Sequence, residues 1–111
     1  MNVLLVVAED RAICESLRAA LPETDLVLFE STLDAALRRL ISMKVDAVLI
    51  DDAPQLGHQA IARFFETAPD TPVIVLSSRS DAESLASWTL AGARACVVKP
   101  FSCEALRGAV E

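Results

Sequence analysis

Two adjacent carboxylates, Asp51 and Asp52, directly follow a short apolar run over residues 47–50. An uninterrupted apolar run of this length is typical of a strand that is buried on both faces of a parallel sheet. Because an unpaired buried charge is costly, a carboxylate at the end of such a strand indicates a function. The structural alternative is a turn that the two aspartates open before Pro54. The other predicted strands help to decide between these interpretations.

Polar side chains also follow the other apolar runs at the point where each run ends. The carboxyl ends of parallel strands meet at the same edge of a sheet, which is where open α/β proteins build their sites. The sequence therefore predicts a cluster of acids, hydroxyls and an ammonium group at one edge of the sheet. Its candidate members, besides the two aspartates, are Glu9, Asp10, Ser77, Ser78 and Lys99.

A cluster of this kind has a specific chemistry. Closely spaced carboxylates repel one another and are best neutralised by a hard cation such as Mg²⁺. A lysine can hold a phosphoryl oxygen as a point charge, and a hydroxyl can hydrogen-bond another. A carboxylate that faces these groups can act as a nucleophile toward phosphorus. As strand neighbours, Asp51 and Asp52 should point to opposite faces, so we expect only one of them in the cluster.

The apolar pattern predicts the elements that position these residues. Strands are expected at residues 3–7, 26–29, 73–76 and 96–98, with another ending at Asp51. Helical spacing lies between them, and the apolar positions of the third helix include Phe64 and Phe65. Ser31 with Asp34, and Ser80 with Glu83, have the spacing of helix N-terminal caps. This alternation predicts an α/β fold, a (βα)5 doubly wound parallel sheet formed by one domain over residues 1–111.

Composition excludes several classes of function. The 111 residues carry a net charge of −6, so the basic surface of a nucleic-acid-binding domain is missing. No apolar run is long enough to cross a membrane. The three scattered cysteines show no metal or disulfide spacing, which favours a cytoplasmic protein. The only histidine, His58, is interpreted as an exposed loop or helix-start residue rather than a catalytic one.

Four segments resemble the receiver domain of two-component response regulators, whose fold is flavodoxin-like. They are VLLVVAED near the N-terminus, DAVLID ending at Asp51, TPVIVLSS from Thr71 and AGARACVVKPF from Ala91. The resemblance implies that Asp51 accepts a phosphoryl group from a histidine kinase or a phosphotransfer protein. It also places the family's hydroxyl at Ser77 and its lysine at Lys99.

The chain departs from the family pattern around the metal site. The family's two acids after the first strand fall on Ala8 and Glu9, and Asp10 is either a further metal ligand or the N-cap of the first helix. The loop after Asp51 is about two residues short, and the carbonyl it offers to Mg²⁺ would come from Ala53. The resemblance thus implies a weak Mg²⁺ site formed by Glu9, Asp10, Asp51 and Ala53. Where the family has an aromatic switch residue, this chain has Cys96, interpreted as a small buried apolar residue.

Two interpretations of function stay open. The first is a working receiver, with at most phospho-acceptor and autophosphatase activity; the second is a pseudo-receiver that acts through protein contacts alone. A metal-dependent hydrolase is disfavoured because a general base is missing. The resemblance implies that an effector, or a second copy in a homodimer, binds the face of the fourth helix, fifth strand and last helix. There we expect Trp88 in the core and Leu90 on the surface. The chain could be the N-terminal part of a longer protein.

Overall fold

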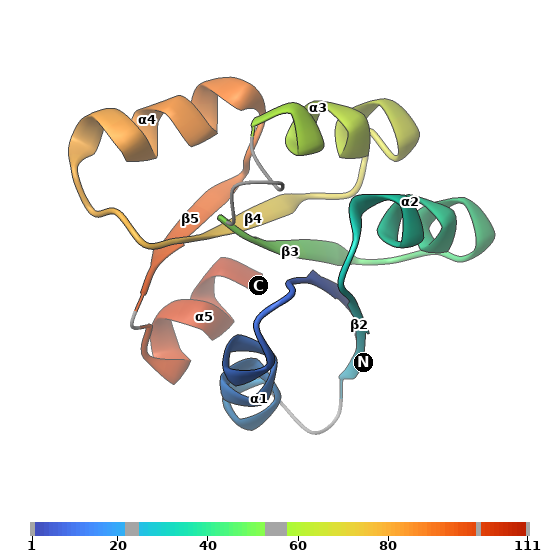
Figure 1. Cartoon of the computed structure of the whole chain (residues 1–111), viewed down its shortest axis with the longest axis horizontal. Coiled ribbons are helices and arrows are strands. Elements are labelled where there is room, and N and C mark those ends of the chain that lie inside the picture. Colours follow the sequence, from blue (N-terminus) through green and yellow to red (C-terminus); the bar gives the residue numbers. More distant parts are fainter. Residues whose placement is uncertain (1, 22–24, 53–57, 100, 111) are drawn as a thin grey trace.

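A computed structural model of the chain describes residues 2–21, 25–52, 58–99 and 101–110. Within these ranges five strands alternate with five helices, as the apolar pattern predicted (Figure 1). No described helix is both long and apolar enough to span a membrane. In chain order the elements are β1 (Val3–Val7), α1 (Arg11–Ala20), β2 (Leu26–Glu30), α2 (Leu33–Ser42), β3 (Ala47–Asp51), α3 (His58–Thr67), β4 (Val73–Ser77), α4 (Ala82–Ala91), β5 (Ala95–Val98) and α5 (Cys103–Val110).

The described strands form one parallel sheet in the order β2-β1-β3-β4-β5. All residues of β3 and β4 are buried, whereas the edge strands β2 and β5 are mostly half-buried. This difference explains the sequence pattern, because a strand with helices on both faces needs apolar residues at every position rather than at alternate ones. The predicted (βα)5 architecture is confirmed.

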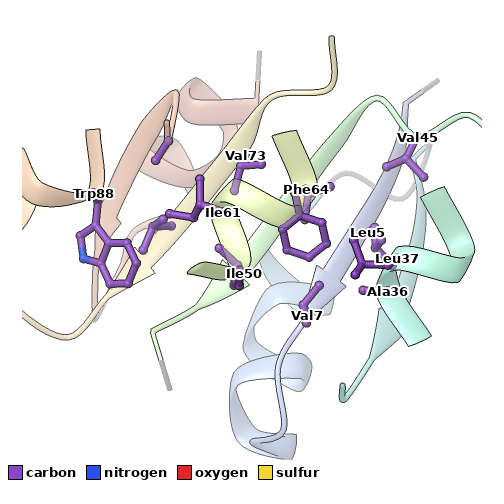
Figure 2. Close-up of a cluster of buried hydrophobic side chains, with 14 residues drawn as sticks. Leu5, Val7, Ala36, Leu37, Val45, Ile50, Ile61, Phe64, Val73 and Trp88 are labelled. Atoms are coloured by element: carbon purple, nitrogen blue, oxygen red, sulfur yellow. The ribbon is translucent and has the colours of Figure 1, made fainter. Parts of the chain in front are cut away.

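Helices cover both faces of the sheet and enclose two apolar cores. Figure 1 shows α1 and α5 on one face and α2, α3 and α4 on the other. The α1/α5 core contains Leu4, Val6, Ala8, Leu17, Ala20, Leu21, Ala47, Leu49, Ile74, Leu76, Val97 and Leu106. The α2–α4 core, shown in Figure 2, contains Leu5, Val7, Ala36, Leu37, Val45, Val48, Ile50, Ala60, Ile61, Phe64, Val73, Val75, Trp88 and Ala93.

The helix caps differ in part from the prediction. Asp10 caps α1, since its Oδ1 accepts a hydrogen bond from the Ala12 N–H at 2.8 Å. The predicted caps at Ser31 and Ser80 are wrong by one residue: α2 is capped by Thr32 and α4 by Asp81. A capping side chain must belong to the extended residue directly before the first helical one, and both helices begin one residue later than the spacing suggested.

α4 ends at a glycine. Gly92 caps the helix with φ at 120°, a backbone conformation that residues with a Cβ rarely adopt. Trp88 lies in the core with 8% of its surface exposed, whereas Leu90 is 88% exposed, as expected.

Of the adjacent residues Phe64 and Phe65, one lies in the core and the other on the surface. Both were expected on the apolar side of α3, but Phe64 is buried and Phe65 is 58% exposed. Successive residues of a helix point about 100° apart, so α3 can turn only one of them fully into the core. Phe64 projects from α3 into the α2–α4 core, which it shares with Leu5 of β1 and Leu37 of α2 (Figure 2).

We expect Phe64→Ala to lower the free energy of unfolding by about 3–5 kcal/mol, because it leaves a cavity that the packed neighbours cannot fill. Phe65→Ala is the matched control and should change the same quantity by less than about 0.5 kcal/mol. Urea unfolding followed by circular dichroism measures both. Equal losses of stability in the two variants would contradict the packing described here.

Candidate functional site

The register of β3, β4 and β5 brings the predicted site residues to one edge of the sheet. Asp51 lies opposite Leu76, and Ser77 lies opposite Val98, the residue before Lys99. The Lys99 N–H extends this pairing by donating to the Ser77 carbonyl oxygen at 2.8 Å. Three adjacent strands therefore carry Asp51, Ser77 and Lys99 to neighbouring positions, as the sequence predicted.

A lysine bridges the two carboxylates at the end of β3. The Lys99 ammonium donates a hydrogen bond to Asp51 Oδ1, and its Nζ lies 3.2 Å from Asp52 Oδ1. The Asp51 side chain is 9% exposed, that of Asp52 11% and that of Lys99 20%. Because these charges are largely withdrawn from water, each depends on its partners for stabilisation. Lys99 thus compensates a pair of acids rather than one.

The position of Asp52 corrects the expectation that only one aspartate enters the cluster. Both carboxylates contact Lys99, since β3 ends at Asp51 and strict alternation no longer fixes the direction of the next side chain. Asp52 Oδ2 also accepts hydrogen bonds from the Ser78 N–H at 2.7 Å and the Ser78 hydroxyl at 2.8 Å. Asp52 is therefore held by β4 and β5 together.

These contacts shift the pKa values of both partners. Burial raises the pKa of the Asp52 carboxyl, but the Ser78 N–H, the Ser78 hydroxyl and the Lys99 ammonium outweigh this effect and hold it below its usual value. Burial lowers the pKa of Lys99, but its hydrogen bonds to Asp51 and Asp52 and their charges raise it overall. Each shift favours the charged form, so the lysine and Asp52 stay ionised near neutral pH.

Ser77 is fully buried, and its hydroxyl is engaged in the turn after β4. It donates to the Arg79 carbonyl oxygen at 2.9 Å and accepts from the Arg79 N–H at 3.2 Å. Val75, two residues earlier, packs in the α2–α4 core, so Ser77 faces that side. By the same alternation Asp51 faces the α1/α5 side, where Leu49 packs. The two residues are thus neighbours at the edge, but their side chains belong to opposite faces.

Among the described residues, the acids after β1 share no hydrogen bond or ion pair with this network. Ala8 is buried, Glu9 is exposed, and Asp10 uses one oxygen to cap α1. Ala53 and Pro54 lie outside the described residues. Among the side chains that the structure describes, no three of His, Cys, Asp or Glu come close enough together to hold a metal ion. Because Mg²⁺ is usually held by one or two carboxylates together with several waters, the weak Mg²⁺ site expected from the sequence stays a prediction.

Two other residues singled out in the sequence, Cys96 and His58, make packing contacts between elements of the fold. Cys96 is half-buried against the α2–α4 core, and burial raises the pKa of its thiol, which agrees with a small apolar residue. His58 begins α3 as expected, and its ring stacks on Trp88 at 4.2 Å between centroids. Its Nε2 also lies 3.0 Å from Ser87 Oγ. These contacts join α3 to α4.

Sequence reasoning missed the connection between Asp52 and Ser78. The available signal was that two doubled residues, Asp51-Asp52 and Ser77-Ser78, end strands that proved to be adjacent. Only the sheet order shows that the second member of each pair meets the other. We therefore define the edge network as Asp51, Asp52, Ser78 and Lys99.

Comparisons with known proteins all find response regulators. The sequence model of the family described as "Response regulator receiver domain" matches residues 4–111. The response regulator MprA of Mycobacterium ulcerans is 34% identical over 107 residues, which cover 93% of this chain and 46% of MprA. The chain thus spans about half the length of this curated relative.

Solved structures show the same fold. A response regulator from Thermotoga maritima superposes with a TM-score of 0.87 at 27% identity, covering 99% of this chain and 98% of the other. The BeF3-activated receiver domain of DrrB, a Thermotoga maritima protein, gives a TM-score of 0.85 at 29% identity, covering 99% and 94% of the two chains.

Removal of the lysine charge tests the edge network. We expect Lys99→Met, which keeps the apolar stem, to raise the pKa of Asp52, because the ammonium's hydrogen bond and charge now lower it. NMR titration of the aspartate carboxyl carbons measures this pKa. Lys44→Met removes the chain's only other lysine, which is exposed, and should leave the value unchanged. The same Asp52 pKa in all three proteins would mean that Lys99 does not contact it in solution.

Proposed function

Because this chain belongs to the response regulator receiver domain family, we propose that it accepts a phosphoryl group on Asp51 and relays the signal through protein contacts. The observation that carries the proposal is the pairing of Asp51 with Lys99 at the carboxyl end of a fully buried strand. Such an end is where α/β sheets place their reactive groups. The donor would be a phosphohistidine of a histidine kinase or of a phosphotransfer protein.

The proposed step is a displacement at phosphorus. A carboxylate oxygen of Asp51 forms the new P–O bond while the P–N bond to the donor imidazole breaks, and the imidazole nitrogen keeps the electron pair. Lys99 serves two purposes in this step. Before transfer its ammonium holds the Asp51 oxygen, and afterwards it can balance the charge of the phosphoryl oxygens at the same position.

The output would pass through other proteins or domains. Because MprA is about twice as long as this chain, we propose that a full-length protein attaches an effector to this domain. The face formed by α4, β5 and α5 would contact that effector or a second receiver in a homodimer. Leu90 of α4 supports this choice, since its side chain is 88% exposed and offers apolar area to a partner.

Incubation with acetyl phosphate and Mg²⁺ tests the phospho-acceptor. We expect intact-mass measurement to show a labile gain of one phosphoryl group in the wild type and none in Asp51→Asn, because the amide lacks the nucleophilic oxygen. Asp46→Asn, which changes the residue directly before the other end of β3, is the control and should label like the wild type. Labelling that persists in Asp51→Asn would place the acceptor elsewhere.

A second candidate function is a receiver that works without phosphorylation. The observation that favours it is the arrangement after β1, where Ala8 is buried, Asp10 caps a helix and Glu9 is exposed. Such a domain would present its α4, β5 and α5 face in one fixed state. Absence of the mass gain in the wild type, with a histidine kinase as well as with acetyl phosphate, would favour this function.

Magnesium affinity follows from the same residues. We expect Mg²⁺ to bind this chain weakly, and Ala8→Asp with Glu9→Asp to tighten binding several-fold. The added acid supplies charge, and the shorter side chain at position 9 loses less entropy when it is fixed. A Mg²⁺ titration followed by amide NMR shifts measures the affinity. Wild-type binding already as tight as in the double variant would make Asp10 the compensating ligand, and Asp10→Asn, which keeps the helix cap, would then weaken it.

A further inference from the structure

The carboxylate of Asp52 is surrounded by hydrogen-bond donors from two strand ends. Ser78 provides its backbone N–H and its hydroxyl to Oδ2 at 2.7 and 2.8 Å, and the Lys99 Nζ lies 3.2 Å from Oδ1. These groups are a backbone amide, a hydroxyl and an ammonium that converge on one small anion. A tetrahedral oxyanion such as a phosphoryl group uses the same kinds of donors.

Two features make Asp52 a strong competitor for these donors. Its side chain is only 11% exposed, so the carboxylate is already desolvated in its place. It is also attached to the chain next to Asp51, which gives it a high effective concentration at the donors. An anion that arrives from solution must displace this carboxylate and also meet its negative charge. The hydrogen-bond donors of Ser78 and Lys99 are therefore already taken by a carboxylate of the protein itself.

There is space beside the donors for another anion. A hollow of about 350 Å³ is lined by Ile13 and Ser16 of α1 together with Ser78, Lys99 and Phe101. It thus contains both residues that hold Asp52. Loss of the Asp52 carboxylate would leave the Ser78 N–H, the Ser78 hydroxyl and the Lys99 ammonium without this acceptor, on two residues that line the hollow.

We propose that Asp52 is a built-in anion that occupies Ser78 and Lys99 and competes with a phosphoryl group for them. Asp52 thereby restrains phosphorylation of Asp51. It also holds the ends of β3, β4 and β5 in one arrangement until a phosphoryl group displaces it. The part concerning phosphorylation rests on the proposed function, whereas the competition for donors does not. The two parts can therefore be tested separately.

Inorganic phosphate, added without Mg²⁺, probes the competition directly. We expect it to shift the Ser78 amide resonance with about tenfold higher affinity in Asp52→Ala than in the wild type, which corresponds to about 1.4 kcal/mol. Asp52→Asn should fall between them, because its amide oxygen can still accept from Ser78 but its charge is lost. The amide spectra of both variants also report whether the fold is intact. If Asp52→Ala does not fold, the comparison of Asp52→Asn with the wild type still tests the proposal.

The matched control is Asp46→Asn, directly before the same strand. Asp46 Oδ2 accepts a hydrogen bond from the Val3 N–H at 2.6 Å, so this variant removes an equal charge that is also bonded to a backbone amide. It lies at the opposite end of β3 and should leave phosphate affinity as in the wild type. Equal affinity in the wild type and both Asp52 variants would overturn the proposal. An equal gain in Asp46→Asn would also overturn it, because the effect would then come from net charge.

Labelling with acetyl phosphate and Mg²⁺ separates this inference from the proposed function. Faster phosphorylation of Asp52→Ala than of the wild type, together with tighter phosphate binding, supports both. Equal labelling rates with unchanged phosphate affinity overturn the role of Asp52 and leave Asp51 as the acceptor. Tighter phosphate binding without labelling of any protein supports the competition and contradicts phosphorylation.

Discussion

The ion pair between Asp51 and Lys99 is the interaction on which the organisation of the site depends. β3 is buried at every position and ends in a carboxylate, which has to be compensated if the strand is to stay in the interior. The compensating ammonium comes from beyond β5, two strands away. It reaches Asp51 because the sheet register aligns the two strand ends, and the Lys99 N–H is itself fixed to the Ser77 carbonyl of the strand between. Backbone pairing and charge compensation thus support one another.

A second acid changes the electrostatics of this edge. Asp51 and Asp52 are adjacent carboxylates that share one ammonium, and Ser78 supplies the remaining hydrogen bonds to Asp52. The network is satisfied as it stands, with every described buried side-chain nitrogen and oxygen bonded. A site in this condition can take up a new anion only by exchanging one set of hydrogen bonds for another. Which anion binds Ser78 and Lys99 therefore depends on the charge of each competitor.

The turn after β4 connects this edge to α4. The Ser77 hydroxyl binds both backbone groups of Arg79, whose guanidinium contacts Asp81 at 3.2 Å. Asp81 in turn caps α4. On its other side α4 is joined to α3 through the stack of His58 on Trp88. The helix whose Leu90 is exposed is therefore fixed at its N-terminus by residues that begin at the sheet edge.

The sequence alone determined the (βα)5 fold and the position of Asp51, because buried parallel strands require continuous apolar runs and a charge that interrupts one stands out. It also determined that Lys99 and the serines follow strands of the same sheet. What it could not determine was where side chains point once a strand has ended. Asp52 was expected to leave the cluster and instead joined it, while Ser77 shares the edge but turns to the opposite face. The helix caps shifted by one residue for a related reason, since a cap depends on the backbone angles of a single residue. Periodicity describes regular elements, and the site lies where they end, so only the tertiary structure decided which donors meet which acids.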